Sequence, residues 1–190
     1  MMVSPLVEAG RRVVAFDAPS HGESGPGHLG PRRSTAIEMM DALEAVADVH
    51  GNPSAVVGHS LGATVATLVA ADGLDAGRLA LVAPSADVLT MTEVMAQRLG
   101  YGPRTKRRFD ARLESMAGRP LRDFDLTSHP MTVPALVVHD QRDKEVPYAQ
   151  GVRIAEAWPN AELLSTDGLG HQRILRDPGV VQAVARFVTG

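Results

Sequence analysis

The sequence predicts an α/β fold, with a mostly parallel sheet of about five strands flanked by helices. Two observations predict it: short apolar runs recur along the chain, and segments with helical periodicity lie between them. The runs are rich in β-branched residues, as expected for parallel strands that are buried on both faces. They cover residues 12–17, 54–59, 78–84, 134–140 and 161–166.

Helices are predicted in the segments that separate and follow these runs. Thr35 and Glu38 have the spacing of a capping box, which marks the start of a helix. The segment after the second run carries small side chains that permit close packing against a sheet, and Pro178 stands at the favoured first position of the last helix. The predicted helices span residues 35–49, 61–71 and 148–157, with a last one that opens at Asp177.

One region interrupts this alternation and is predicted to form a short helical cap, residues 87–129, within a single domain that spans residues 1–190. It has no strand pattern and contains the basic cluster "PRTKRR", which is expected to be a solvated face. Its methionines are expected to line the core of the cap itself, and the alternative is an adaptable apolar wall for a substrate. They are Met91, Met95 and Met116.

The composition is that of an ordinary globular chain, with 44% hydrophobic and 22% charged residues. A net charge of -3 gives no electrostatic reason to expect a nucleic acid or an anionic membrane as partner. The absence of cysteine excludes disulfides and thiolate chemistry. Neither a signal peptide nor a run of about 18 apolar residues is present, so a cytoplasmic location is expected.

The pentapeptide "GHSLG", residues 58–62, matches the nucleophile elbow G-x-S-x-G. An apolar run precedes it and a small-residue helix follows, which is the context that the motif requires. The neighbours two residues to either side, Gly58 and Gly62, must be small in such a turn. The turn would expose the hydroxyl of Ser60 at a helix N-terminus, where developing negative charge is stabilised. The alternative is that Ser60 is only a structural turn residue.

A serine nucleophile needs a base to take its proton and a third group to orient that base. His171 stands on a glycine-rich loop after the last apolar run, and such a loop suits a histidine that must reach a serine from another strand. His59 lies inside the elbow, and its side chain is expected to point away from the serine. Two carboxylates follow the fourth run: Asp140 ends it, and Asp143 lies on the loop beyond.

Four stretches together resemble the α/β-hydrolase family, in the branch related to serine aminopeptidases, haloperoxidase-like enzymes and small carboxylesterases. They are "FDAPSHGES", "GHSLG", "HDQRDKEVP" and "GLGH", in the family's order over nearly the whole chain. The resemblance implies that Ser60 is the nucleophile and His171 the base. It assigns the acid to Asp143 rather than Asp140. The backbone N–H of Leu61, the residue after the nucleophile, would contribute to the oxyanion hole.

The expected activity is therefore hydrolysis of a small-molecule carboxylic ester through an acyl-enzyme, with an amide as the second choice of substrate. No metal or organic cofactor is implied. Dehalogenases and epoxide hydrolases of this fold normally carry aspartate where Ser60 stands, which argues against those reactions. The rival hypothesis is a catalytically inactive α/β-hydrolase-like protein that binds a ligand or dimerises.

The rival arises because the family takes its second oxyanion donor from a loop after a strand that has no counterpart before Val13. That strand belongs in the sheet between residues 12–17 and 54–59, so its absence is expected to leave buried backbone groups unpaired. Three outcomes are open. The reading frame continues upstream, the first predicted strand closes up on the elbow strand, or a second copy pairs with the open edge in a homodimer.

Overall fold

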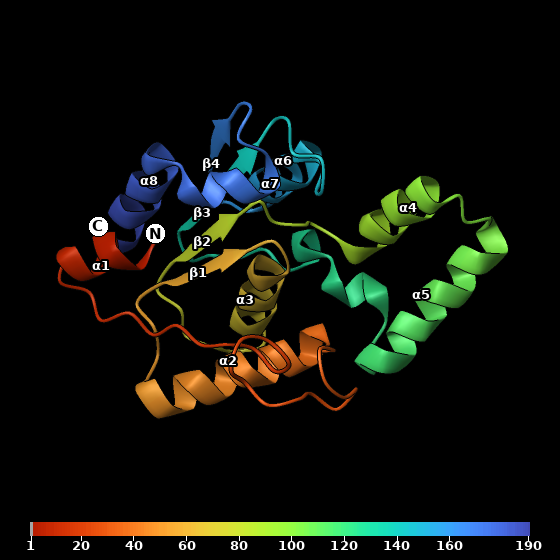
Figure 1. Ribbon diagram of the computed structural model, residues 1–190. Coiled ribbons are helices and arrows are strands. Elements are labelled where there is room, and N and C mark those ends of the chain that lie inside the picture. The colour runs from red at the N-terminus through yellow and green to blue at the C-terminus, as the bar shows by residue number, and fades with distance from the viewer. Residues whose placement is uncertain (1) are drawn as a thin grey trace.

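The computed structural model describes residues 2–190 and contains a parallel four-stranded sheet with helices on both faces (Figure 1). Each strand pairs with the next strand along the chain, so the order in the sheet is β1-β2-β3-β4. The predicted fold class is confirmed. The strands are β1 (Val56–His59), β2 (Leu79–Val82), β3 (Ala135–Asp140) and β4 (Ala161–Thr166).

The helices form two layers around the sheet. One face is covered by α2 (Ala36–His50), α3 (Leu61–Ala71) and α6 (Tyr148–Ala157), and the other by α1 (Val3–Glu8) and α8 (Pro178–Thr189). All four predicted helices are present, and the capping box between Thr35 and Glu38 is formed. Asp177 caps α8 by accepting the backbone N–H of Val180 at 3.0 Å. None of the helices between residues 2 and 190 is long and apolar enough to cross a membrane.

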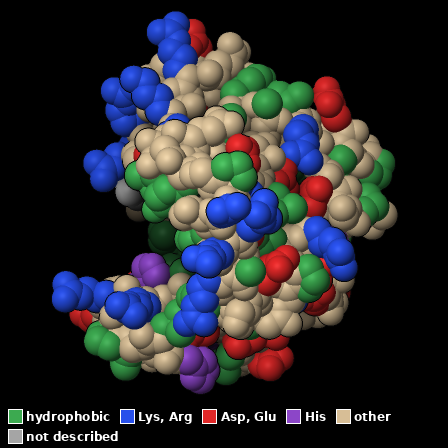
Figure 2. Space-filling view, turned by 90° about the vertical axis from the view of Figure 1, so that its right-hand side faces the viewer, with side chains coloured by type: hydrophobic (Ala, Val, Ile, Leu, Met, Phe, Trp, Pro, Cys, Tyr) green, Lys and Arg blue, Asp and Glu red, His purple; other side chains and the backbone are tan. Residues whose placement is uncertain are grey.

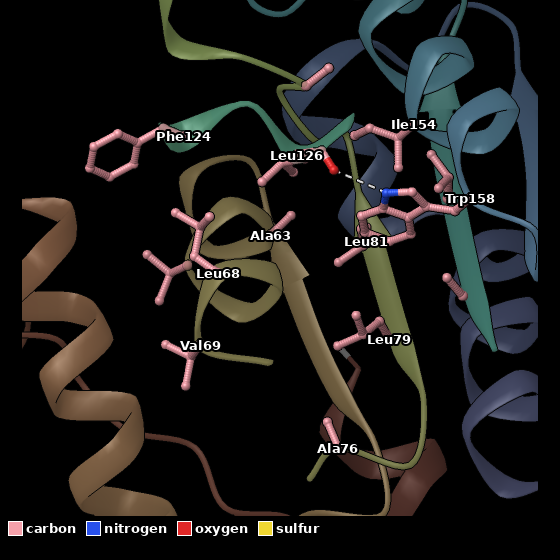
Figure 3. Packing of buried hydrophobic residues seen from close by; sticks show 14 of the residues in the cluster. Ala63, Leu68, Val69, Ala76, Leu79, Leu81, Phe124, Leu126, Ile154 and Trp158 are labelled. Carbon is pink, nitrogen blue, oxygen red and sulfur yellow. Dashed lines mark hydrogen bonds between the residues drawn. The ribbon is translucent and has the colours of Figure 1, made fainter. Parts of the chain in front are cut away.

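The two central strands are buried along their whole length, as their continuous apolar runs predict. Successive side chains alternate between the two faces, so Leu79 and Leu81 pack on the α3 side and Ala80 and Val82 on the α8 side. The α3-side core also holds Trp158, whose indole N–H donates to the Leu126 carbonyl at 3.0 Å (Figure 3). Because the strands are parallel, the residues at their carboxyl ends lie together at one end of the sheet.

The prediction of a strand at residues 12–17 is wrong. This segment joins no sheet, and Val14 and Phe16 are 40% and 41% exposed. The Arg11 and Arg12 guanidinium groups each donate at 2.6 Å, to the backbone carbonyls of Thr189 and His50 respectively. An apolar run becomes a buried strand only where a neighbouring strand can pair with it, and residues 2–190 supply none at this place.

The first predicted strand has not closed up on the elbow strand, because β1 is itself an edge of the sheet. The backbone N–H of Val56 donates to the carbonyl of Arg78, directly before β2, and that of Ser60 donates to the carbonyl of Val82, the last residue of β2. In a parallel ladder the groups of Val57 and His59 must then face the outer edge. Val57 is 38% exposed, so this edge is open to solvent and is not an empty slot inside the sheet. The expected penalty for buried unpaired groups is thereby reduced.

The segment between β2 and β3 is helical, as predicted, and projects to the side toward which the strand arrows point (Figure 1). Figure 2 looks onto this side and shows Lys and Arg side chains spread over it. Met95 on α4 and Met116 on α5 are exposed, so the expectation that they line a core is wrong for these two, whereas Met91 is half-buried. No residue of α5 is fully buried. The helices are α4 (Val88–Leu99), α5 (Pro103–Ala117), and the short η1 (Leu121–Phe124) and η2 (Leu126–Ser128).

Candidate active site

Ser60 occupies a strained turn between β1 and α3. Its backbone angles are φ 53° and ψ -122°, a region that residues with a side chain rarely adopt. Such a conformation costs about 1–3 kcal/mol and persists only where the surroundings impose it. Here the Ser60 N–H donates to the Val82 carbonyl at 2.9 Å, and the Ser60 carbonyl accepts the Ala63 N–H at 3.0 Å. The strain lies at the residue that the elbow motif singles out.

The two glycines of the motif have different surroundings. A Cβ atom on Gly58 would lie 2.5 Å from the Gly62 carbonyl oxygen and 2.7 Å from the backbone nitrogen of Ala63. A Cβ atom on Gly62 would meet nothing within 4 Å. The steric requirement that the sequence suggested for both positions therefore holds only for Gly58, because α3 begins directly against β1.

Asp143 and His171 form a buried pair. The Nδ1–H of His171 donates to Asp143 Oδ2 at 2.7 Å, and the side chains are 4% and 0% exposed for His171 and Asp143. Asp143 Oδ1 accepts the backbone N–H groups of Glu145 at 2.8 Å and Val146 at 2.9 Å. The carboxylate is thus fixed by its own loop. With Nδ1 bound to Asp143, Nε2 is the ring nitrogen of His171 that is left to accept a proton.

Asp140, the other carboxylate at the end of β3, makes different contacts. It accepts the backbone N–H of Arg142 at 2.9 Å on Oδ1, and the Thr166 hydroxyl at 2.7 Å and the Leu169 N–H at 2.9 Å on Oδ2. Burial raises the pKa of Asp140, but these hydrogen bonds, with one from the Gly170 N–H, outweigh burial and bring the pKa to about 2. Asp140 therefore anchors the segment between β4 and α7 (Gly170–Arg173). His171 lies in this short helix, so the prediction that it stands on a loop is wrong.

Replacing Asp140 by asparagine is expected to lower the free energy of unfolding, with a difference from wild type that depends on pH. The folded pKa of about 2 lies below the usual 3.8, so the unfolded chain takes up the proton first as the pH falls. The stabilisation, on the order of 2 kcal/mol, is complete above about pH 4 and is lost as the pH falls through about 2.

Urea unfolding at pH 6, 4 and 2.5 checks this expectation. The difference between wild type and Asp140→Asn should shrink as the pH falls, whereas the exposed Asp41→Asn control should match wild type at each pH. A constant difference for Asp140→Asn would contradict the role of the carboxylate charge.

Two further histidines contact the pair, although the sequence predicted no contact with it for either. His139 is fully buried, and its Nε2 lies 3.1 Å from the Val146 carbonyl and 3.5 Å from Asp143 Oδ2. Burial lowers the pKa of His139, partly offset by the bond to the Val146 carbonyl and the charge of Asp143. A Cβ atom on Gly151 would lie 2.5 Å from its Nδ1, so that glycine makes room for the ring. The alternation of side chains along β3 signals that His139 shares the buried face of Val137.

His59 is the second of these histidines. Its Nε2 lies 3.0 Å from the backbone oxygen of His171, and the two ring centroids are 4.7 Å apart. The expectation that this side chain points away from the serine did not include a contact with His171. The motifs in the sequence assign no partner to this side chain, and its contact lies 112 positions away.

The remaining predicted residues lie at the carboxyl end of β1. Leu61 is 43% exposed and begins α3, and no hydrogen bond within residues 2–190 occupies its backbone N–H. No hydrogen bond in this part of the chain joins the Ser60 hydroxyl to His171 either. The same residues contain no cluster of three His, Asp or Glu side chains that could hold a metal ion. The structure brings Asp143 and His171 together and leaves the contact with Ser60 open.

The comparisons with known proteins show the family of the chain. The model of the alpha/beta hydrolase family matches residues 2–159, and the chain belongs to this family. The match includes Ser60 and Asp143 and ends before His171. None of the curated proteins matches the sequence.

Solved structures resemble the chain at low sequence identity. A monoacylglycerol lipase from Paleococcus ferrophilus has a TM-score of 0.74 at 18% identity, over 99% of this chain and 87% of the lipase. A hydrolase from Pseudomonas aeruginosa has a TM-score of 0.71 at 23% identity, over 98% and 83% of the two chains. A thermophilic esterase has a TM-score of 0.61 at 22% identity, over 90% and 78%. At these identities the likeness establishes the fold.

Proposed function

We propose that this protein is a serine hydrolase that cleaves a small-molecule carboxylic ester with Ser60, His171 and Asp143. The observation that carries the proposal is the buried hydrogen bond of 2.7 Å between His171 Nδ1 and Asp143 Oδ2, which joins α7 to the loop after β3. A histidine held in this tautomer by a fixed carboxylate is what a serine nucleophile requires as its base. The names of two similar structures, a monoacylglycerol lipase and an esterase, favour an ester.

The reaction has two halves. In the first, Ser60 Oγ attacks the carbonyl carbon while His171 Nε2 takes the hydroxyl proton, and the tetrahedral intermediate carries its negative charge on the former carbonyl oxygen. That oxygen would be stabilised by the Leu61 N–H at the start of α3. The C–O bond to the alcohol then breaks, and the alcohol leaves with the proton from His171.

In the second half, water gives a proton to His171 Nε2 and attacks the acyl-enzyme. The bond to Ser60 Oγ breaks, Ser60 recovers its proton, and a carboxylic acid leaves. Asp143 holds Nδ1–H throughout and stabilises the imidazolium that forms in each half. The mechanism requires the Ser60–His171 hydrogen bond to form when substrate binds, and catalytic hydrogen bonds commonly tighten at that stage.

A fluorophosphonate probe tests the proposal, because it reacts covalently with an activated serine. Wild type is expected to gain one adduct by intact mass, and Ser60→Ala is expected to gain none. Ser115→Ala, at an exposed serine on α5, is the matched control and should react as wild type does. Parallel assays with p-nitrophenyl esters and p-nitroanilides separate ester from amide hydrolysis.

The second candidate is an inactive α/β-hydrolase-like binding protein. The observation that favours it is the lack of a hydrogen bond between Ser60 and His171 in the part of the chain that the structure describes. Folded wild-type protein that gains no adduct would support this candidate and overturn the enzyme.

A further inference from the structure

His59 is the last residue of β1 and stands directly before Ser60 in the chain. Its side chain reaches α7, the short helix after β4, where Nε2 lies 3.0 Å from the backbone oxygen of His171. The two imidazole rings are inclined at 46° with their centroids 4.7 Å apart. His59 therefore touches the proposed base at both its main chain and its ring.

The direction of this hydrogen bond follows from its acceptor. A carbonyl oxygen only accepts, so His59 carries a proton on Nε2 and donates it to the carbonyl of His171. The bond from His59 fixes the main chain of His171, whereas the bond that His171 Nδ1–H donates to Asp143 fixes its ring. The two anchoring residues come from different parts of the sheet: His59 ends β1, and Asp143 lies on the loop after β3.

We propose that His59 is a positioning residue that ties α7, the short helix of the catalytic base, to the strand of the nucleophile, an inference that rests on the proposed hydrolase function. Since His59 and Ser60 are adjacent residues, any movement of α7 away from the elbow must break this bond. A displacement of about 1 Å between nucleophile and base is enough to cost on the order of 100-fold in rate.

The charge state of His59 suits this role. Burial lowers its pKa, against the opposing effects of the bond to the His171 carbonyl and of the charges of Asp143 and Glu145. The nearby His171 lowers it further. A neutral His59 leaves the ring of His171 free to become an imidazolium during the reaction, because a second cation at 4.7 Å would oppose that charge.

Two substitutions separate the hydrogen bond from the bulk of the ring. His59→Leu removes the donor, and His59→Gln retains an uncharged N–H donor at similar reach. With a p-nitrophenyl ester, His59→Leu is expected to lower kcat by about 10- to 100-fold with KM within about twofold of wild type. His59→Gln is expected to restore kcat to within a few fold. His50→Leu, at an exposed histidine at the end of α2, is the control and should leave both constants unchanged.

A second measurement does not depend on activity. The His171 Nδ1–H held by Asp143 should give a downfield proton resonance in ¹⁵N-labelled protein, with slow exchange to water. In His59→Leu this proton is expected to broaden or exchange about 10-fold faster, and in His59→Gln it should persist. If His59→Leu does not fold, His59→Asn replaces it, because the shorter amide cannot reach the His171 carbonyl.

The outcomes distinguish the two proposals. Wild type that resists the fluorophosphonate probe would overturn the hydrolase function, while the resonance would still report whether His59 holds His171. If His59→Leu keeps the wild-type kcat and an undisturbed His171 Nδ1–H resonance, the positioning role of His59 is overturned and the hydrolase function still stands. Loss of kcat in His59→Gln equal to that in His59→Leu would also contradict the role of the hydrogen bond.

Discussion

Replacing Asp143 by asparagine is expected to lower kcat/KM by about 10⁴-fold while the fold is retained. The size of this loss in kcat/KM follows from which ring nitrogen of His171 carries the proton, and not only from the lost charge of Asp143. In the native site Asp143 Oδ1 accepts two backbone N–H groups, from Glu145 and Val146, and Oδ2 accepts the Nδ1–H of His171.

An asparagine at this position has only one oxygen for these two sites. The two fixed backbone donors claim that oxygen, so the amide NH₂ must face His171. The amide NH₂ and the Nδ1–H of His171 are both donors and cannot form a hydrogen bond with each other. His171 therefore shifts its proton from Nδ1 to Nε2, so that Nδ1 can accept from the amide. Nε2 is then no longer able to accept the proton of Ser60, and the base is lost even though every atom stays near its native place.

Steady-state kinetics with a p-nitrophenyl ester and ¹⁵N spectra of the imidazole rings test this argument together. We expect Asp143→Asn to show His171 protonated on Nε2, with urea unfolding changed much less than activity. Asp75→Asn, at an exposed carboxylate between α3 and β2, is the control and should keep wild-type kinetics. An Asp143→Asn variant within tenfold of wild type would show that the pair is structural.

The second large effect is expected from alanine at Gly58, which should lower the free energy of unfolding by about 3 kcal/mol or more. The added Cβ would lie 2.5 Å from the Gly62 oxygen and 2.7 Å from Ala63 N and Cα. All three are backbone atoms, so relief requires α3 to move away from β1. That movement would also release the strained turn at Ser60. Against a typical stability of about 5–15 kcal/mol, such a loss is severe.

Gly62→Ala is the matched control, because it adds the same methyl group four residues further on. Nothing lies within 4 Å of its Cβ position, and alanine favours a helix over glycine by up to about 1 kcal/mol. Urea unfolding midpoints should therefore fall for Gly58→Ala and stay level or rise for Gly62→Ala. Equal losses in the two variants would contradict the close contact between α3 and β1.

Much of the fold could be predicted from local patterns. The continuous apolar runs of β2 and β3 predict strands buried on both faces, and the structure buries every residue of both. The helix starts at Thr35 and Asp177 could be predicted because each cap is formed within a few residues of the chain. Such signals depend on neighbours in sequence, and these are fixed before the chain folds.

The failed prediction at residues 12–17 has the opposite origin. Its composition is that of a strand, but Val14 and Phe16 remain exposed because no other strand lies beside them. Hydrogen bonding between strands is a property of two segments, and a single segment cannot reveal whether its partner exists.

By itself the sequence determined the alternation of strands and helices, the elbow at Ser60, and the order in which a serine, an acid and a histidine follow one another. The resemblance already favoured Asp143 over Asp140 as the partner of His171, but only the tertiary structure decided what each carboxylate contacts. Asp143 accepts the Nδ1–H of His171, whereas Asp140 accepts the Thr166 hydroxyl and backbone N–H groups. The tertiary structure also decided that His59 and His139 contact the pair. These contacts join residues from separate strands, and their geometry exists only after the sheet has assembled.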